Sequence, residues 1–131
     1  MFERIDHVGF IVDDIDSALT VYGETFELEL VHRAVHDEAG LDIALLQVGE
    51  SRIELLAPIS PDSVFADAKR GMHHVAYGVA DIDAALELLQ AREVELVDTS
   101  PRVGVLDSRI AFLHPHAAAG VLTELVQAAP A

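Results

Sequence analysis

The pattern of apolar and polar residues along this chain occurs twice. Residues 5–12 and 73–79 are apolar, extended stretches, and each leads into a pair of aspartates. Apolar residues then follow at positions i, i+3, i+4 and i+7 in both residues 15–22 and residues 82–89, which predicts a helix with one buried face in each copy. Because aspartate favours the N-cap of a helix, the aspartates predict where both helices begin.

The two copies match residue by residue when the sequence is compared with itself at an offset of 67 positions. Over the sixteen positions that begin at His7 and His74, eight are identical, and the matches include polar positions such as Asp14/Asp81. Such agreement indicates an internal duplication. Each copy also contains three further strand candidates, at residues 28–35, 42–48 and 52–57 in the first and 94–98, 108–114 and 121–127 in the second.

We therefore predict an α+β fold that consists of two tandem βαβββ modules in a single domain, residues 1–131. The repeats span residues 3–57 and 72–127, and a linker at residues 58–71 joins them. This linker contains proline and serine, and a short helix is expected over residues 62–69.

Composition narrows the function classes. The chain has 131 residues, 51% of them hydrophobic, and it has no cysteine, which excludes disulfides, thiolate metal sites and cysteine nucleophiles. A net charge of -15 repels phosphate backbones and argues against nucleic-acid binding. The sequence has no apolar run of membrane-spanning length and no secretory leader pattern, so we expect a cytoplasmic protein that does not bind membranes.

The two matched histidines are predicted to face a cavity. Alternate residues of a strand share a face, so His7 lies with Gly9, and His74 lies with Ala76. Bulky residues occupy the other face of both strands, where they are expected to pack on the helix of their own module. The small residues beside the histidines leave room for an opening.

A glutamate recurs in the last strand of each copy, as Glu54 and Glu124. A charged carboxylate in an apolar strand costs several kcal/mol unless it is paired, protonated or bound to a cation. Histidine and glutamate are ligands of divalent metals, so the duplication predicts one shared metal site at His7, Glu54, His74 and Glu124. Taken singly, each histidine could instead be structural, and Glu54 could lie on an edge strand beside Arg52.

The other histidines have no matched partner in the duplication. His73 is predicted to be structural, on the helix-facing side of its strand, and surface positions are expected for His32, His36 and His116.

Six short motifs resemble the methylmalonyl-CoA epimerase family of the vicinal oxygen chelate superfamily: RIDHVG, IELLAP, SPDS, GMHHVA, FLHP and GVLTEL. The resemblance covers residues 3–127. It implies a cupped, mixed sheet of glyoxalase-like fold around a divalent metal (Co, Mn, Ni, Zn or Mg), a small-molecule acyl-CoA substrate and a homodimer. It also implies epimerisation at C2 of methylmalonyl-CoA, or of a related 2-substituted malonyl-CoA, through a metal-chelated enolate.

The resemblance assigns roles to individual residues of this chain. It implies metal ligands at His7, Glu54, His74 and Glu124, with glutamine at the position of Glu54 in some members, and it makes Glu124 the catalytic base as well. Some members carry a second base where this chain has Ile43. Asp42 is adjacent, but strand alternation turns it to the opposite face unless a bulge intervenes.

A second departure from the family pattern follows Gly104. Val105 and Leu106 stand where further glycines are usual, and His116 stands where a lysine is usual after FLHP. Arg102 and Arg109 remain as candidate contacts to substrate anions, and the alternative for both is ordinary surface charge.

Other functions stay open at this point. A glyoxalase-type lyase or isomerase of the same superfamily would share the metal and the enolate chemistry. Dioxygenation is less favoured, because four protein ligands leave fewer open positions than the iron sites of dioxygenases prefer. A metal-free binding protein is a further alternative, against which the full set of four ligand residues counts.

Overall fold

The computed structural model describes residues 1–131, which divide into two compact units. One unit is formed by residues 7–73, and the other combines residues 1–6 with residues 74–131. None of the helices is long and apolar enough to span a membrane.

The first unit is built on strands in the order β2-β3-β4-β1. The strands are β1 (Arg4–Ile11), β2 (Glu29–His36), β3 (Leu41–Val48) and β4 (Ser51–Pro58). Strand β1 runs parallel to β4. The pairs β2–β3 and β3–β4 are antiparallel. A tight turn joins β3 to β4, and Gly49 at its start adopts a φ of 58°, a conformation that favours glycine.

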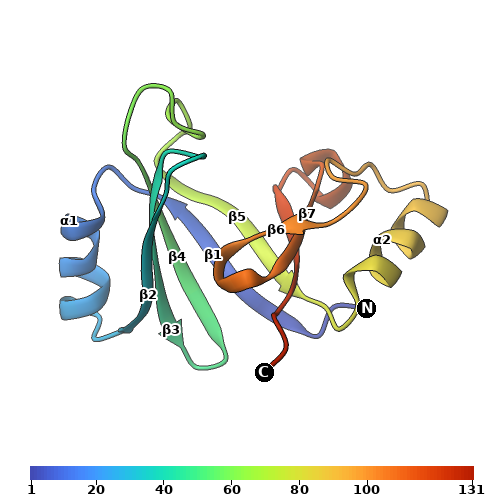
Figure 1. Cartoon of the computed structure of the whole chain (residues 1–131), viewed down its shortest axis with the longest axis horizontal. Helices are drawn as coiled ribbons and strands as arrows, with labels where there is room; N and C mark the ends of the chain where they lie inside the picture. Colours follow the sequence, from blue (N-terminus) through green and yellow to red (C-terminus); the bar gives the residue numbers. More distant parts are fainter. The chain divides into compact units, whose positions relative to one another are not determined.

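One helix covers one face of this sheet. Helix α1 (Ile15–Leu19) lies beside the strands of its own unit (Figure 1). Its Ile15 is 1% exposed and packs in one core cluster with Leu46 and Leu55, and Phe10 packs against the same cluster. The prediction that the bulky face of the first strand packs on its helix is therefore confirmed.

The aspartates at the predicted helix starts are N-caps. Asp14 accepts a hydrogen bond of 2.8 Å from the backbone N–H of Ser17, and Asp81 accepts one of 3.1 Å from that of Ala84. The first α-helix is shorter than predicted, because the chain changes after Leu19 into a π-helical segment, η1 (Thr20–Thr25). This segment is rich in β-branched residues and contains a glycine, all of them weak formers of α-helix.

The second unit repeats the order of elements with the strand order β5-β8-β7-β6. Its strands are β5 (Gly71–Gly78), β6 (Arg102–Val103), β7 (Arg109–Leu113) and β8 (Thr123–Gln127), and its helical segments are α2 (Ile82–Ala91), η2 (Val105–Asp107) and η3 (Pro115–Ala118). Helix α2 buries Ile82, Leu86 and Leu89 against Leu125 of the sheet. Both units thus have the predicted βαβββ order, and the α+β class is confirmed.

The strand predicted at residues 94–98 is wrong. Only one bridge forms there, between Leu96 and Leu113, and the pairing strand is the two-residue β6. The carboxylate of Asp98 accepts a 2.9 Å hydrogen bond from the backbone N–H of Phe112. A side chain that bonds the backbone in this way replaces a rung of the sheet ladder, so regular pairing stops at this point.

The helix predicted at residues 62–69 is also wrong, since this part of the linker consists of turns. Ser63 accepts hydrogen bonds from the backbone N–H groups of Ile59 (3.2 Å) and Ser60 (2.9 Å), which closes a turn instead. Phe65 has a φ of 65°, outside the helical region, and this interrupts any helix.

The N-terminal residues belong to the second unit, although the predicted first repeat starts at residue 3. The N–H of Glu3 donates to the carbonyl of Gly78 at 2.9 Å, and the ring of Phe2 stacks on Tyr77 with 4.6 Å between centroids. The start of β1 is therefore anchored on the unit that contains β5.

Candidate functional site

The first unit contains a buried histidine–glutamate pair. Nε2 of His7 on β1 lies 3.6 Å from Oε1 of Glu54 on β4, and both residues are 6% exposed. In the parallel ladder Glu54 is directly opposite Gly9, two residues after His7 and on the same face. Because β4 lies between β3 and β1, Glu54 is not on an edge strand, and Arg52 bonds to Gln47 instead.

The second unit contains the same pair. Nε2 of His74 on β5 lies 3.4 Å from Oε2 of Glu124 on β8, and the two residues are 2% and 5% exposed. Here Glu124 is directly opposite Ala76, again two residues after the histidine. The duplication seen in the sequence therefore reproduces one diagonal contact between two parallel strands, next to a small residue in both units.

The donor atoms of each pair suit a divalent cation. An imidazole nitrogen and a carboxylate oxygen are both ligands of first-row metals, and ligands bound at about 2.0–2.2 Å lie roughly 3.0–3.5 Å apart on one ion. The observed separations of 3.6 Å and 3.4 Å are close to this range. Both pairs are buried among apolar strands, where a cation would offset the cost of a charged carboxylate.

The position expected for a second base is apolar. The ladder between β3 and β4 runs from Leu41 to Val48 without a bulge, and it places Leu45 opposite Glu54. Ile43, two residues away, is therefore on the Glu54 face, 4% exposed. Asp42 lies on the opposite face, where Arg33 donates to it at 3.0 Å, so the bulge that could have redirected it does not occur.

Arg102 lies near the pair of the second unit. Phe112 is directly opposite Glu124 in the ladder, and its ring meets that of His74 edge-on, with 5.8 Å between centroids. The guanidinium of Arg102 is 5.4 Å from the centre of the Phe112 ring and 3.3 Å from Asp98. This cation is half exposed and stacked on the aromatic ring that contacts His74.

Arg109 is engaged elsewhere, as ordinary surface charge. It donates to both carboxylate oxygens of Asp83 at 2.7 Å and 3.1 Å, and these hydrogen bonds hold the pKa of Asp83 below its ordinary value. In the first unit, hydrogen bonds to Asp42 and Asp16 raise the pKa of Arg33. An aspartate in the first turn of each helix is thus paired with an arginine from a strand of the same unit.

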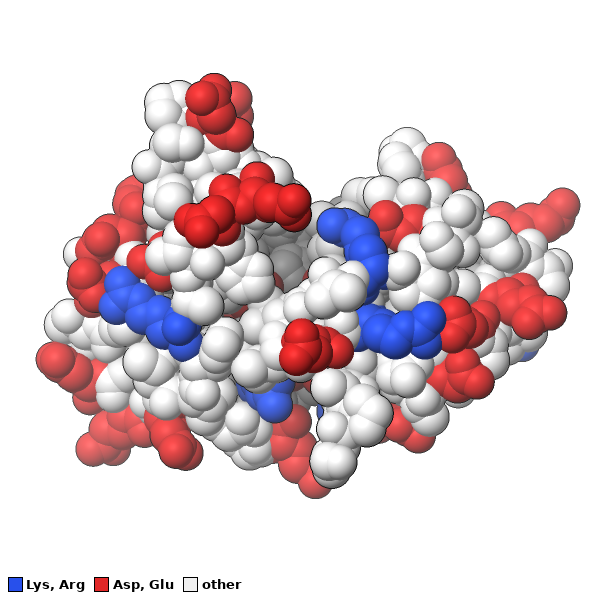
Figure 2. All heavy atoms as spheres, viewed as in Figure 1, with Lys and Arg blue, Asp and Glu red and all other residues white.

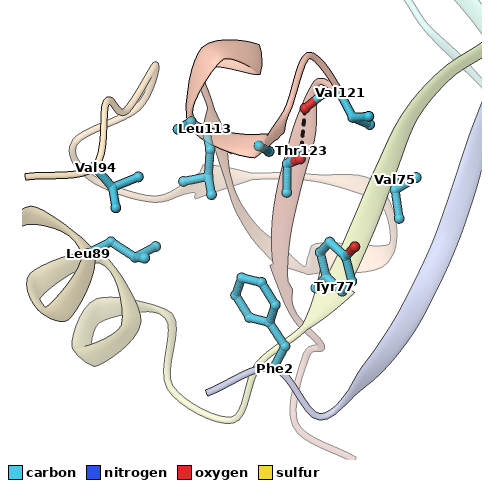
Figure 3. A pocket seen from close by; sticks show the side chains of 10 residues that line it. Phe2, Val75, Tyr77, Leu89, Val94, Leu113, Val121 and Thr123 are labelled. Carbon is cyan, nitrogen blue, oxygen red and sulfur yellow. Dashed lines mark hydrogen bonds between the residues drawn. The ribbon is translucent and has the colours of Figure 1, made fainter. Parts of the chain in front are cut away.

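An apolar pocket of about 440 Å³ lies on the helix side of the second sheet (Figure 3). Val75 and Tyr77 line it from the face of β5 opposite to His74, and Leu89 lines it from α2. The hydroxyl of Thr123 donates its proton to the carbonyl of Val121 at 2.8 Å. The pocket offers no charged group, so we do not assign it to the His74–Glu124 site.

The remaining histidines behave differently from one another. The ring of His73 packs against Phe65 with 4.3 Å between centroids, a structural contact as predicted. His116 is exposed, as predicted, whereas His32 and His36 are half-buried. The sequence reasoning missed that His116 lies beside His114 and Glu95. The sequence His114-Pro115-His116 could have indicated a pair of neighbouring imidazoles, but nothing in the sequence placed Glu95 next to them.

The surface has the charge that the composition implies. On the face shown in Figure 2, acidic side chains are spread over the molecule and basic ones are few, in keeping with the net charge of -15. Long-range electrostatics therefore attract cations, and any anionic ligand must be held by local positive groups.

Comparison with known proteins identifies relatives along nearly the whole chain. The mitochondrial methylmalonyl-CoA epimerase of Bos taurus is 30% identical over 130 residues, covering 95% of this chain and 74% of the relative. The crystal structure of methylmalonyl-CoA epimerase from Mycobacterium tuberculosis has a TM-score of 0.90 and 39% identity, covering 98% of this chain and 90% of that one.

A third relative was solved with a ligand. A methylmalonyl-CoA epimerase in complex with methylmalonyl-CoA and NH4+ has a TM-score of 0.89 and 38% identity, with coverage of 98% and 96% of the two chains. The family model described as the glyoxalase/bleomycin resistance protein/dioxygenase superfamily matches residues 6–112. The chain, with its two βαβββ units and their repeated histidine–glutamate pairs, belongs to the glyoxalase/bleomycin resistance protein/dioxygenase superfamily.

Proposed function

We propose that this protein is a metal-dependent epimerase that inverts C2 of methylmalonyl-CoA or of a closely related 2-substituted malonyl-CoA. The observation that carries the proposal is the repeated buried pair, His7–Glu54 and His74–Glu124, in a chain whose relatives include methylmalonyl-CoA epimerases. A fold alone would not support a reaction, because this superfamily hosts several.

In this proposal one divalent cation is held jointly by His7, Glu54, His74 and Glu124. When bound, the cation supplies positive charge that stabilises negative charge developing on the substrate's carboxylate and thioester oxygens. Imidazole and carboxylate ligands accept Co, Mn, Ni, Zn or Mg, so the donor set does not select one of them. The repeats at 3–57 and 72–127 then act as one domain, each contributing one pair.

Glu124 is the proposed base. Its carboxylate is 5% exposed and has His74 as a neighbour, so it is shielded from bulk water and positioned by the sheet. Removal of the C2 proton leaves a planar carbon, and inversion requires that a proton return to the opposite face. Since Ile43 cannot carry a proton, we propose that a water molecule or a further side chain delivers it.

Arg102 is the proposed contact to a substrate anion. An acyl-CoA carries carboxylate and phosphate charges that the acidic surface would repel, and arginine is well suited to hold such groups. Arg102 is half exposed, lies over Phe112 and has one ion-pair contact of 3.3 Å with Asp98, whereas Arg109 donates to both carboxylate oxygens of Asp83. We also propose that the enzyme is a homodimer and that it is located in the cytoplasm.

The deciding experiment is deuterium incorporation from heavy water into methylmalonyl-CoA, with metal-depleted and metal-restored protein, followed by an assay of configuration at C2. Metal-dependent exchange with inversion is the expected result. Exchange without inversion would show that the second proton donor is absent. If protein that holds metal catalyses no exchange, the substrate is wrong and a glyoxalase-type lyase or isomerase reaction becomes the better proposal.

A further inference from the structure

A second cluster of metal-binding side chains lies in the second unit, outside the histidine–glutamate pairs. It consists of Glu95, His114 and His116, whose potential ligand atoms all lie within 4.8 Å of one another. Oε2 of Glu95 is 3.9 Å from Nδ1 of His114 and 4.0 Å from Nδ1 of His116. The two imidazole rings are 4.4 Å apart between centroids.

The backbone holds these three residues in place. The N–H of His114 donates to the carbonyl of Glu95 at 3.0 Å, next to the bridge between Leu96 and Leu113. The short helical turn η3 starts at Pro115 and turns the chain so that His116 lies beside His114. Little backbone entropy remains to be lost when a ligand orders these side chains.

One ring nitrogen of His114 is placed as an acceptor. The backbone N–H of His116 donates to Nδ1 of His114 at 3.2 Å, so the Nδ1 lone pair points toward His116. A metal needs that lone pair, and it would replace a long hydrogen bond. The side chains of Glu95 and His116 are 61% and 80% exposed, so they can rotate to shorten the present separations.

Two imidazoles and one carboxylate form a ligand set used by zinc, with water completing the coordination at an exposed position. Imidazole ligands favour Zn, Cu, Ni and Co over Mg and Ca, which prefer oxygen ligands. The net charge of -15 also draws cations to the surface.

We infer that Glu95, His114 and His116 form a surface site for a divalent transition-metal cation of the zinc class. This site does not depend on the proposed epimerase function or on its metal.

Zn²⁺ titration of the ¹⁵N-labelled protein, followed by NMR of the histidine ring nitrogens, tests the site residue by residue. The His74→Ala variant is titrated alongside, so that zinc bound through His74 is distinguished. We expect the His114 and His116 signals to shift together at equimolar Zn²⁺ in His74→Ala, and in the unaltered protein once Zn²⁺ exceeds the one equivalent that the site containing His74 can bind. His116→Ala and Glu95→Gln should each weaken zinc binding at this site by about tenfold or more.

His36→Ala is the matched control, because it removes an imidazole that belongs to neither cluster, and its zinc response should equal that of the unaltered protein. Mg²⁺ in place of Zn²⁺ should leave the His114 and His116 signals unchanged. The inference is wrong if equimolar Zn²⁺ leaves both rings unshifted in His74→Ala, if all histidines shift alike, or if His116→Ala binds zinc at this site with unaltered affinity. An equal response to Mg²⁺ would overturn the assignment to the zinc class.

Discussion

Nε2 of His74 lies 3.4 Å from Oε2 of Glu124, diagonally across two parallel strands, and His7 stands in the same relation to Glu54 in the other unit. The same buried pair in both units is the arrangement that the proposed shared metal site requires. Each residue of these pairs is accordingly a target for substitution.

His74→Ala should remove both metal and turnover at the proposed site. The substitution deletes an imidazole ligand and leaves Glu124 buried without its neighbour, which weakens cation binding. Metal content after dialysis and the rate of deuterium exchange measure the two effects. His36→Ala serves as the control for the loss of a histidine. Unchanged metal content, once zinc bound at Glu95, His114 and His116 has been subtracted, would show that His74 is not a ligand.

Glu54→Gln and Glu124→Gln form a matched pair of substitutions. Both remove the charge of a buried glutamate beside a histidine, but only Glu124 is the proposed base. We expect Glu124→Gln to slow proton exchange at C2 by about 10²–10⁴-fold, the usual contribution of a general base. Glu54→Gln should retain most of the exchange, because an amide oxygen can still serve as a ligand. Equal losses in the two variants would assign Glu124 to metal binding alone.

Helix α2 offers an equally direct comparison for stability. Leu86 is 3% exposed and Leu88 is 40% exposed, and both are leucines in the interior of one helix. Leu86→Ala should lower the free energy of unfolding by about 2–5 kcal/mol through lost burial and a residual cavity. Leu88→Ala changes helix propensity by the same amount without opening a cavity, so its effect should be much smaller. Urea denaturation measures both; similar losses would contradict the observed burial.

Acid pH should weaken the pair formed by Asp83 and Arg109. Its hydrogen bonds with Arg109 lower the pKa of Asp83 below the ordinary 3.8. A carboxyl with a lowered pKa in the folded state stabilises the fold above its unfolded pKa, and this contribution is lost as pH falls through the folded pKa. Arg109→Gln should raise the pKa of Asp83 toward its ordinary value, as followed by ¹³C NMR of the carboxyl carbon. An unaltered titration of Asp83 would refute this contact in solution.

Elements set by local periodicity were predictable from the sequence. Residues 82–89 show helical spacing after Asp81, and helix α2 begins at Ile82 with Asp81 as its cap. Failures occurred where a side chain competes with the backbone, as at Asp98, or where a residue takes a left-handed conformation, as at Phe65. Neither event leaves a periodic signal.

The sequence alone determined the duplication and the βαβββ order. It also identified four candidate ligands, His7, Glu54, His74 and Glu124, because strand alternation and internal matching can be read from the sequence. Tertiary structure decided which histidine meets which glutamate, since that depends on the register of β1 with β4 and of β5 with β8. It also brought Glu95 to His114, and it left the β3–β4 ladder without the bulge that could have redirected Asp42. These features depend on strand pairing and register, which no local pattern specifies.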